Sequence, residues 1–165
     1  MDLTPRIEMS IGDQRYTSLN DFGAVVAASQ SAGEVVFHAE GRLMTASRKP
    51  VPGGDIRYRM MYRIGETGVE IAGSASGPGA GSAHLRLIVP VIARGDEHAD
   101  VVSASSVQIA KAKGVLLATT GAASGFDAAA LKEKTFNLVP GFEAVPLIVA
   151  LEAGKDVRVE LRVEN

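Results

Sequence analysis

The stretch Asp55–Gly73, with the sequence DIRYRMMYRIGETGVEIAG, decides the fold of this chain. Alternate positions share one face of an extended strand, and that face carries Ile56, Tyr58, Met60, Tyr62 and Ile64. The opposite face carries Arg57, Arg59 and Arg63, with Met61 among them. The segment Gly65-Glu66-Thr67-Gly68 predicts a tight turn, because glycine tolerates the positive φ that hairpin loops often need. The apolar face resumes at Val69 and Ile71. The stretch therefore predicts a β-hairpin, which needs a facing layer because an isolated hairpin is barely stable in water.

Length and composition predict one globular domain. The chain has 165 residues, of which 46% are apolar and 22% charged. We expect a single β-sandwich domain over residues 1–165. Met1 could also be a start placed before a domain excised from a larger, exported protein, and we keep this as a hypothesis.

Charge and cysteine usage exclude several functions. The net charge of −2 argues against non-specific nucleic-acid binding. The absence of cysteine excludes disulfides, thiolate metal sites and cysteine nucleophiles, and it leaves the redox compartment undecided. No apolar run approaches the ~20 residues of a membrane-spanning helix, and the N-terminal residues lack the pattern of a signal peptide.

The rest of the chain predicts further strands and one short helix. Apolar residues alternate along Arg6–Ile11 and Asp156–Glu164. Other expected strands are Arg15–Leu19, Glu34–Ser47 with a bend or bulge at Gly41, His84–Arg94 with a bulge or edge at Pro90, Ser106–Lys111, Val115–Thr120, Phe136–Val139 and Phe142–Leu151. A two-turn helix is expected over Asp127–Lys134, because Asp127 can cap it and Ala-Ala-Ala-Leu favours it. These elements predict an all-β fold, a two-layer antiparallel β-sandwich with roughly ten to twelve strands.

Two sequence motifs have alternative functional interpretations. Thr119–Gly125, TTGAASG, resembles the glycine-rich turn of short-chain dehydrogenases, but Asp127 stands where the third glycine would be, and no βαβ units follow. We therefore predict no nucleotide cofactor and interpret it as a loop. Asp96, Glu97, His98 and Asp100 could hold Ca²⁺, but their order does not match an EF-hand. We expect a solvated acidic loop and no metal site.

Catalytic residues are not identifiable from the sequence. His38, His84 and His98 are far apart, and no serine lies in a G-x-S-x-G elbow. Glycosidase chemistry needs two carboxylates that flank a substrate, and nothing pairs the available ones. We therefore predict no catalytic residue.

The arginine side of the hairpin is the candidate ligand-binding site. With Tyr58 or Tyr62 near an edge, the guanidinium groups of Arg57, Arg59 and Arg63 could clamp the carboxylates of an acidic polysaccharide. The alternative is an ordinary wet face, on which these arginines pair across strands with Glu40 or Glu70. The absence of tryptophan argues against a dedicated carbohydrate-binding module.

Several segments together resemble a known family. The runs GRLMTAS, DIRYRMMYRIGETGVEIAG and LRLIVPVIARGDE resemble the β-sandwich that follows the catalytic helical domain in heparinase-like polysaccharide lyases and related carbohydrate-active enzymes. The matching positions are Tyr58, Tyr62, Pro90 and Val91, and the closing runs FNLVPGFEAVPLIVAL and KDVRVELRV resemble the tail of such a sandwich. The similarity extends over Val35–Val163. It implies an accessory domain without catalytic residues, in a periplasmic or secreted enzyme.

Three functional hypotheses follow. The first is a non-catalytic domain that supports an adjoining catalytic domain or contacts acidic polysaccharide, with Gly73–Ser82 as a loop near the substrate cleft. The second is a free-standing sandwich that binds a small ligand or a partner protein. The third is a small mutarotase-like or epimerase-like sugar enzyme that uses His84 or His98 with a glutamate. Neither membrane nor nucleic acid is an expected partner, and the sequence does not indicate an oligomeric state.

Overall fold

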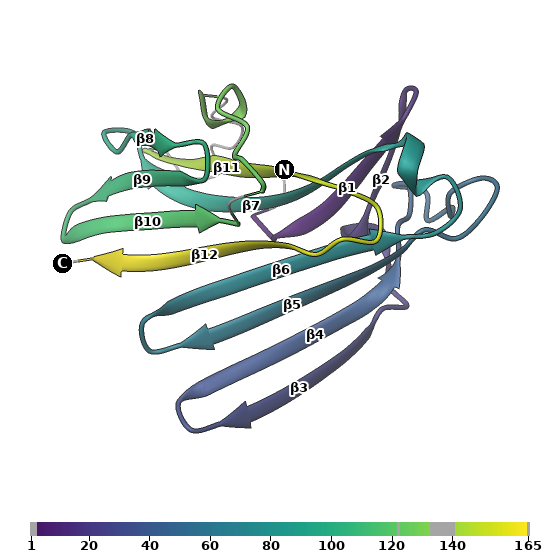
Figure 1. The fold of residues 1–165 in the computed structure, drawn as a ribbon, viewed down its shortest axis with the longest axis horizontal. Helices are drawn as coiled ribbons and strands as arrows, with labels where there is room; N and C mark the ends of the chain where they lie inside the picture. The colour runs from purple at the N-terminus through teal and green to yellow at the C-terminus, as the bar shows by residue number, and fades with distance from the viewer. Residues whose placement is uncertain (1–2, 122, 133–140, 165) are drawn as a thin grey trace.

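The computed structural model describes residues 3–121, 123–132 and 141–164, which form twelve β-strands in two antiparallel sheets (Figure 1). The smaller sheet has the order β11-β7-β1-β2, and its strands are β1 (Arg6–Ile11), β2 (Gln14–Thr17), β7 (His84–Arg94) and β11 (Phe142–Leu151). The larger sheet has the order β3-β4-β5-β6-β12-β10-β9-β8. Its strands are β3 (Val25–Ser31), β4 (Glu34–Arg42), β5 (Arg57–Gly65), β6 (Gly68–Ser76), β8 (Ala99–Ser103), β9 (Ser106–Lys111), β10 (Gly114–Thr120) and β12 (Val157–Glu164). The predicted antiparallel β-sandwich is confirmed.

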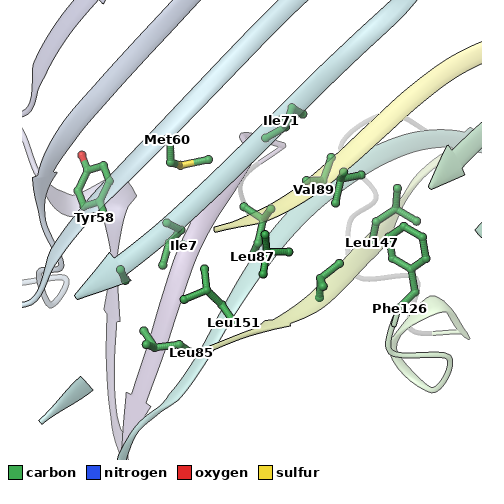
Figure 2. Packing of buried hydrophobic residues seen from close by; sticks show 14 of the residues in the cluster. Ile7, Tyr58, Met60, Ile71, Leu85, Leu87, Val89, Phe126, Leu147 and Leu151 are labelled. Atoms are coloured by element: carbon green, nitrogen blue, oxygen red, sulfur yellow. The ribbon is translucent and has the colours of Figure 1, made fainter. Parts of the chain in front are cut away.

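One apolar core lies between the sheets. Ile7 and Leu87 of the smaller sheet and Met60 and Ile71 of the larger one are buried and point into the same cluster (Figure 2). The sheets approach each other closely at Gly73, where a Cβ atom would lie 3.2 Å from the end carbons of both Ile7 and Leu87. A side chain at this position would force the layers apart, so the glycine sets their local spacing.

The central hairpin has its turn at the predicted residues, but the turn glycines have another role than expected. Strands β5 and β6 pair from Arg57↔Ser76 to Gly65↔Gly68, so Glu66 and Thr67 form the loop. Neither glycine of this turn has a positive φ, which corrects the expected role of the turn glycines. Gly68 is needed for space instead, because a Cβ atom there would collide with the carbonyl oxygen of Leu161 on β12.

The burial of β5 follows the predicted alternation only in part. Tyr58 and Met60 are buried, whereas Arg57, Arg59 and Arg63 are exposed. At the end of the strand the alternation stops, and Ile64 is 44% exposed although it is on the core-facing side. This face of β5 therefore continues beyond the cover that the described residues of the smaller sheet provide.

Strand β4 corrects the expectation of a bulge at Gly41. Its pairing with β5 runs without a register shift from Val35↔Ile64 to Arg42↔Arg57 and includes Gly41↔Tyr58. The glycine instead makes room for a side chain, because a Cβ atom there would collide with Asp21 Oδ2 and lie 3.0 Å from the Tyr58 hydroxyl. The same Asp21 oxygen accepts a hydrogen bond of 2.7 Å from the backbone N–H of Arg42. Gly41 thus lets the loop before β3 bind the end of β4.

The predicted helix is replaced by a turn of 3-10 helix. The structure has three such turns in its described residues, η1 (Ser18–Asn20), η2 (Ala80–Ser82) and η3 (Ala130–Lys132). Asp127 does cap η3, because its Oδ1 accepts hydrogen bonds from the N–H groups of Ala129 at 3.0 Å and Ala130 at 3.2 Å. The rest of the expected helix, and the expected strand Phe136–Val139, lie outside the described residues.

The number and bounds of the strands also differ in part from the prediction. Strands β3 and β8 were not predicted, and the expected strand Arg15–Leu19 is divided between β2 and η1. Pro90 causes no register shift in the pairing of β7 with β11, where it lies opposite Pro146. Strand β1 pairs with β7 only as far as Ile88, so among the described residues β11 is the only strand that pairs with β7 at Pro90. Of the two expectations for Pro90, this placement agrees with a position at a sheet edge and not with a β-bulge.

Within residues 3–121, 123–132 and 141–164, none of the helices has the length and apolar character needed to cross a membrane.

We predict that Gly41→Ala lowers the free energy of unfolding by about 1–3 kcal/mol, the usual range for an overpacked site. The added methyl group would displace the Asp21 carboxylate and break its hydrogen bond to Arg42. Urea denaturation followed by circular dichroism measures the change. Gly95→Ala is the matched control, because a Cβ atom there meets nothing within 4 Å. Equal stability of both variants would contradict the packing role of Gly41.

Candidate functional site

The hairpin arginines lie on the outer face of the larger sheet, away from the core. Arg57, Arg59 and Arg63 alternate with the core-facing residues of β5 and are exposed to solvent. The side chain of Arg59 is 76% exposed and that of Arg63 is 44% exposed. The face that carries the predicted site is therefore open.

Most cations on this face pair with carboxylates of neighbouring strands. Arg59 Nε lies 3.1 Å from Glu40 Oε1, and these residues are directly opposed on β5 and β4. Arg63 Nη1 lies 3.7 Å from Glu70 Oε2 across β5 and β6. Arg158 Nε of β12 lies 3.3 Å from the other Glu70 oxygen, without the alignment of a hydrogen bond. The expected cross-strand pairs with Glu40 and Glu70 are both present. The exposed pair of Arg59 with Glu40 contributes little stability, whereas the side chain of Glu70 is only 13% exposed.

Arg57 differs from the other two hairpin arginines. Its side chain has no ion pair with any residue that the structure describes. It borders a hollow of about 380 Å³ whose polar lining includes Glu40, Arg57, Arg59, Ser74, Ser76 and Asp156. The hollow thus combines two guanidinium groups and two hydroxyl groups, which can donate hydrogen bonds, with two carboxylates, which can accept them.

The two tyrosines of the predicted site are separated from the arginine side chains. Tyr58 borders the hollow but is only 4% exposed, and it belongs to the core cluster. Tyr62 is half-buried on the same side of the strand, and its hydroxyl group donates a hydrogen bond of 3.2 Å to the carbonyl oxygen of Pro5. Burial, the Asp21 carboxylate and Tyr62 raise the pKa of Tyr58 to about 12. The alternation of β5 places these tyrosines toward the core and the arginines toward solvent.

A second charged cluster, centred on Glu8, lies on the outer face of the smaller sheet. Glu8 is completely buried, and its carboxylate binds Arg6 at 2.5 Å, Arg86 at 3.1 Å and also Arg15. Arg6 is buried as well, whereas the other two arginines are partly exposed. Burial alone would raise the pKa of Glu8, but hydrogen bonds from Arg15 and Arg6, with their charges, bring the pKa below its ordinary value.

Sequence reasoning missed this cluster. Glu8 alternates with Ile7 and Met9 and therefore looks like a polar residue on a solvated strand face. Arg86 is 78 residues away in the chain and becomes a neighbour only because β7 pairs with β1. The one sequence feature that could have indicated the cluster was the presence of Arg6 and Glu8 two residues apart in the same strand.

The other motifs take no part in a common site. Glu97 of the acidic loop accepts a hydrogen bond of 2.6 Å from Lys111 Nζ and another of 2.9 Å from the backbone N–H of Arg94. In the described part of the chain, no group of three or more acidic or histidine side chains could hold a metal ion. His84 begins β7, and His98 lies in the loop before β8, on the other sheet. Thr119 and Thr120 belong to β10, an antiparallel strand between β9 and β12.

Comparison with known proteins points to polysaccharide lyases. A family model described as the ulvan lyase C-terminal domain matches residues 1–164. A broad-specificity ulvan lyase from Formosa agariphila is 29% identical over 158 residues, which cover 91% of this chain and 23% of the lyase. The chain therefore spans about a quarter of the length of the curated relative that it matches. No solved structure matches it. The resemblance to a polysaccharide lyase domain is confirmed, whereas its heparinase-like assignment stays a prediction.

We predict that Glu8→Gln lowers the free energy of unfolding at neutral pH by about 3 kcal/mol, because it leaves three arginines around a neutral, buried group. Since the folded pKa of Glu8 is lowered, its stabilisation is complete above the ordinary value of 4.5 and is lost as the pH falls through the lowered value. Urea denaturation from pH 7 to pH 3 measures both effects. Glu152→Gln is the control, because its side chain is 75% exposed. A stability equal to that of the control would contradict the structural role of Glu8.

We predict that the protein loses stability as the pH rises from 10 to about 12, because Tyr58 ionises at about 12 when folded but near 10 when unfolded. Ultraviolet difference spectra follow the phenolate, and denaturation follows stability over the same range. In Tyr58→Phe the phenolate titration near pH 12 is lost and the decrease of stability with pH becomes shallower. An unchanged pH profile in this variant would contradict the assignment.

Proposed function

Because this chain belongs to the ulvan lyase C-terminal domain family, we propose that it is a non-catalytic accessory domain of a polysaccharide lyase that contacts an acidic polysaccharide through the hairpin hollow. The observation that carries the proposal is the guanidinium group of Arg57 at this hollow, which forms no ion pair with the described residues. A guanidinium group binds a carboxylate through two parallel hydrogen bonds, so a free one is a ready site for an acidic sugar.

The surroundings of Arg57 suit a sugar that is both acidic and rich in hydroxyl groups. Arg59 lies 3.1 Å from Glu40 across the strands, so the hollow offers a paired guanidinium group beside the one of Arg57. The hydroxyl groups of Ser74 and Ser76 add neutral donors, and the carboxylate of Asp156 can accept a bond from a sugar hydroxyl. The mixture of charges favours a ligand of mixed polarity over a densely charged one.

The chemical step of such a lyase would belong to another part of a longer protein. In this proposal the domain holds a section of the polysaccharide near the catalytic region, which raises the local substrate concentration. Ulvan is the first polysaccharide to test, because the relative from Formosa agariphila is described as an ulvan lyase.

We predict that the 165-residue chain binds ulvan oligosaccharides and that Arg57→Gln weakens the affinity about tenfold, the loss of roughly one charge-assisted hydrogen-bonded contact. Isothermal titration calorimetry at low and high salt measures the affinity, and increasing salt should weaken binding to the wild type more than to the variant. Arg94→Gln is the matched control, because this exposed arginine lies on the smaller sheet. No measurable binding by the wild type, or equal losses in both variants, would overturn the proposal.

A further inference from the structure

We propose that the inner face of the larger sheet, where the described residues leave it uncovered toward its β3–β5 end, is the surface on which the catalytic region of a longer lyase chain docks. This inference rests on the proposed role as an accessory domain, but it concerns the opposite face of the sheet from the arginine hollow. Its support comes from the register of the strands and from the exposure of apolar side chains.

The two sheets differ in width. Neighbouring strands lie about 4.8 Å apart, so a sheet of eight strands is about 34 Å wide and a sheet of four is about 14 Å wide. The smaller sheet therefore cannot cover the whole inner face of the larger one. Strands β3, β4 and the outer part of β5 extend away from the smaller sheet (Figure 1).

The strand register identifies the side chains on this uncovered area. On β5, Tyr58 and Met60 point into the core, so Tyr62 and Ile64 are on the same, inner face. The residues paired with this row on neighbouring strands share that face. On β3 this face also carries the small Ala28 and the polar Gln30. We call its larger apolar side chains the apolar strip, which consists of Val26, Val35, Phe37, Ile64, Val69, Leu161 and Val163.

The apolar strip is a continuation of the core that lacks a cover in the described structure. Val69 and Leu161 are half-buried and pack against the core cluster. Beyond them, Ile64 is 44% exposed, and Val26 and Val163 are each 64% exposed. Single exposed apolar residues are ordinary, but a row that continues a buried face across several strands is typical of an interaction surface.

The outer face at the same end of the sheet has a different composition. It carries Glu34, Glu40, Arg59 and Arg63 among the apolar residues Val25, Val36 and Met61, whereas no charged residue lies on the inner face of β3, β4 and β5. The contrast between the two faces is the pattern of a sheet with one buried side.

Strand β3 adds a second feature of a docking site. It is an edge strand of the larger sheet, all seven of its residues are exposed, and its sequence VVAASQS contains no charged residue and no proline. Free edge strands usually carry such protective residues, because an unprotected edge pairs readily with another chain. An edge of this kind is suited to being covered in the assembled protein.

The lengths of the proteins favour a docked region of the same chain over a second copy of this domain. The matched part is only 23% of the relative, so most of that lyase lies outside it. A stable dimer usually needs roughly 20–30 contact residues on each partner, whereas the apolar strip has far fewer. A covalent connection raises the effective concentration, so a small apolar surface is sufficient.

The test compares hydrogen exchange of the 165-residue chain with that of the protein encoded by its complete reading frame. We expect the amides of β3 and β4 to exchange at least about tenfold more slowly in the longer protein, because docking would cover them. Val26→Lys and Ile64→Lys in the longer protein should remove this protection. Val25→Lys should retain it, because Val25 is a neighbour on β3 that points to the outer face and is 71% exposed.

Several outcomes would overturn the inference. Equal exchange in the two proteins, or equal effects of Val25→Lys and Val26→Lys, would show that the apolar strip is not the docking surface. The inference would also be overturned if the complete reading frame encoded no region beyond this domain. It would equally be overturned if the 165-residue chain formed a dimer that Val26→Lys dissociates and Val25→Lys does not, because a second copy would then be the occupant. Failure of ulvan binding would overturn only the role of the arginine hollow, because that measurement concerns the other face.

Discussion

The structure depends on the close contact between two sheets whose strands bury every second side chain. At Gly73 the sheets are in close contact, with the side chains of Ile7 and Leu87 next to the position that a Cβ atom would take. Strands β1 and β7 supply these side chains from distant parts of the sequence, and they are neighbours in the smaller sheet. Burial of this apolar surface is the main favourable term for a fold without disulfides.

The same constraint explains which parts of the fold could be predicted from the sequence. Strands β1 and β11 have the predicted bounds, because β1 alternates apolar with polar residues and β11 is a nearly continuous apolar run. Strand β3 gave no such signal, since both of its faces are exposed and its residues are small or polar beyond Val26. Asp127 was recognised as a cap, but the alanines after it form a 3-10 turn whose Ala130 and Leu131 are buried by packing.

The candidate sites could be predicted only where they depend on local sequence. The outward direction of Arg57, Arg59 and Arg63 follows from strand alternation, and so does the inward direction of Tyr58. The hollow beside Arg57 was not predicted, because Gly73–Ser82 was expected to be a loop whereas β6 continues to Ser76 and places Ser74 beside Arg59. Asp156 reaches the hollow from the distant loop before β12. Long-range pairing likewise created the Glu8 cluster. Glycines were misjudged for a related reason, since Gly41 and Gly68 make room for Asp21 and Leu161 rather than for an unusual backbone angle.

The excess width of the larger sheet joins these observations in one physical argument. A sheet gains stability from each added strand only if one of its faces is removed from water, yet β3 and β4 add apolar residues where the described smaller sheet provides no cover. Phe37 and Ile64 would be a liability on a free domain, because an exposed apolar row beside an open edge favours aggregation. In a domain that is one part of a longer enzyme, the same residues become useful. The inner face can then hold the domain against its neighbour while the arginine-bearing outer face, on the same strands, stays open to a polysaccharide.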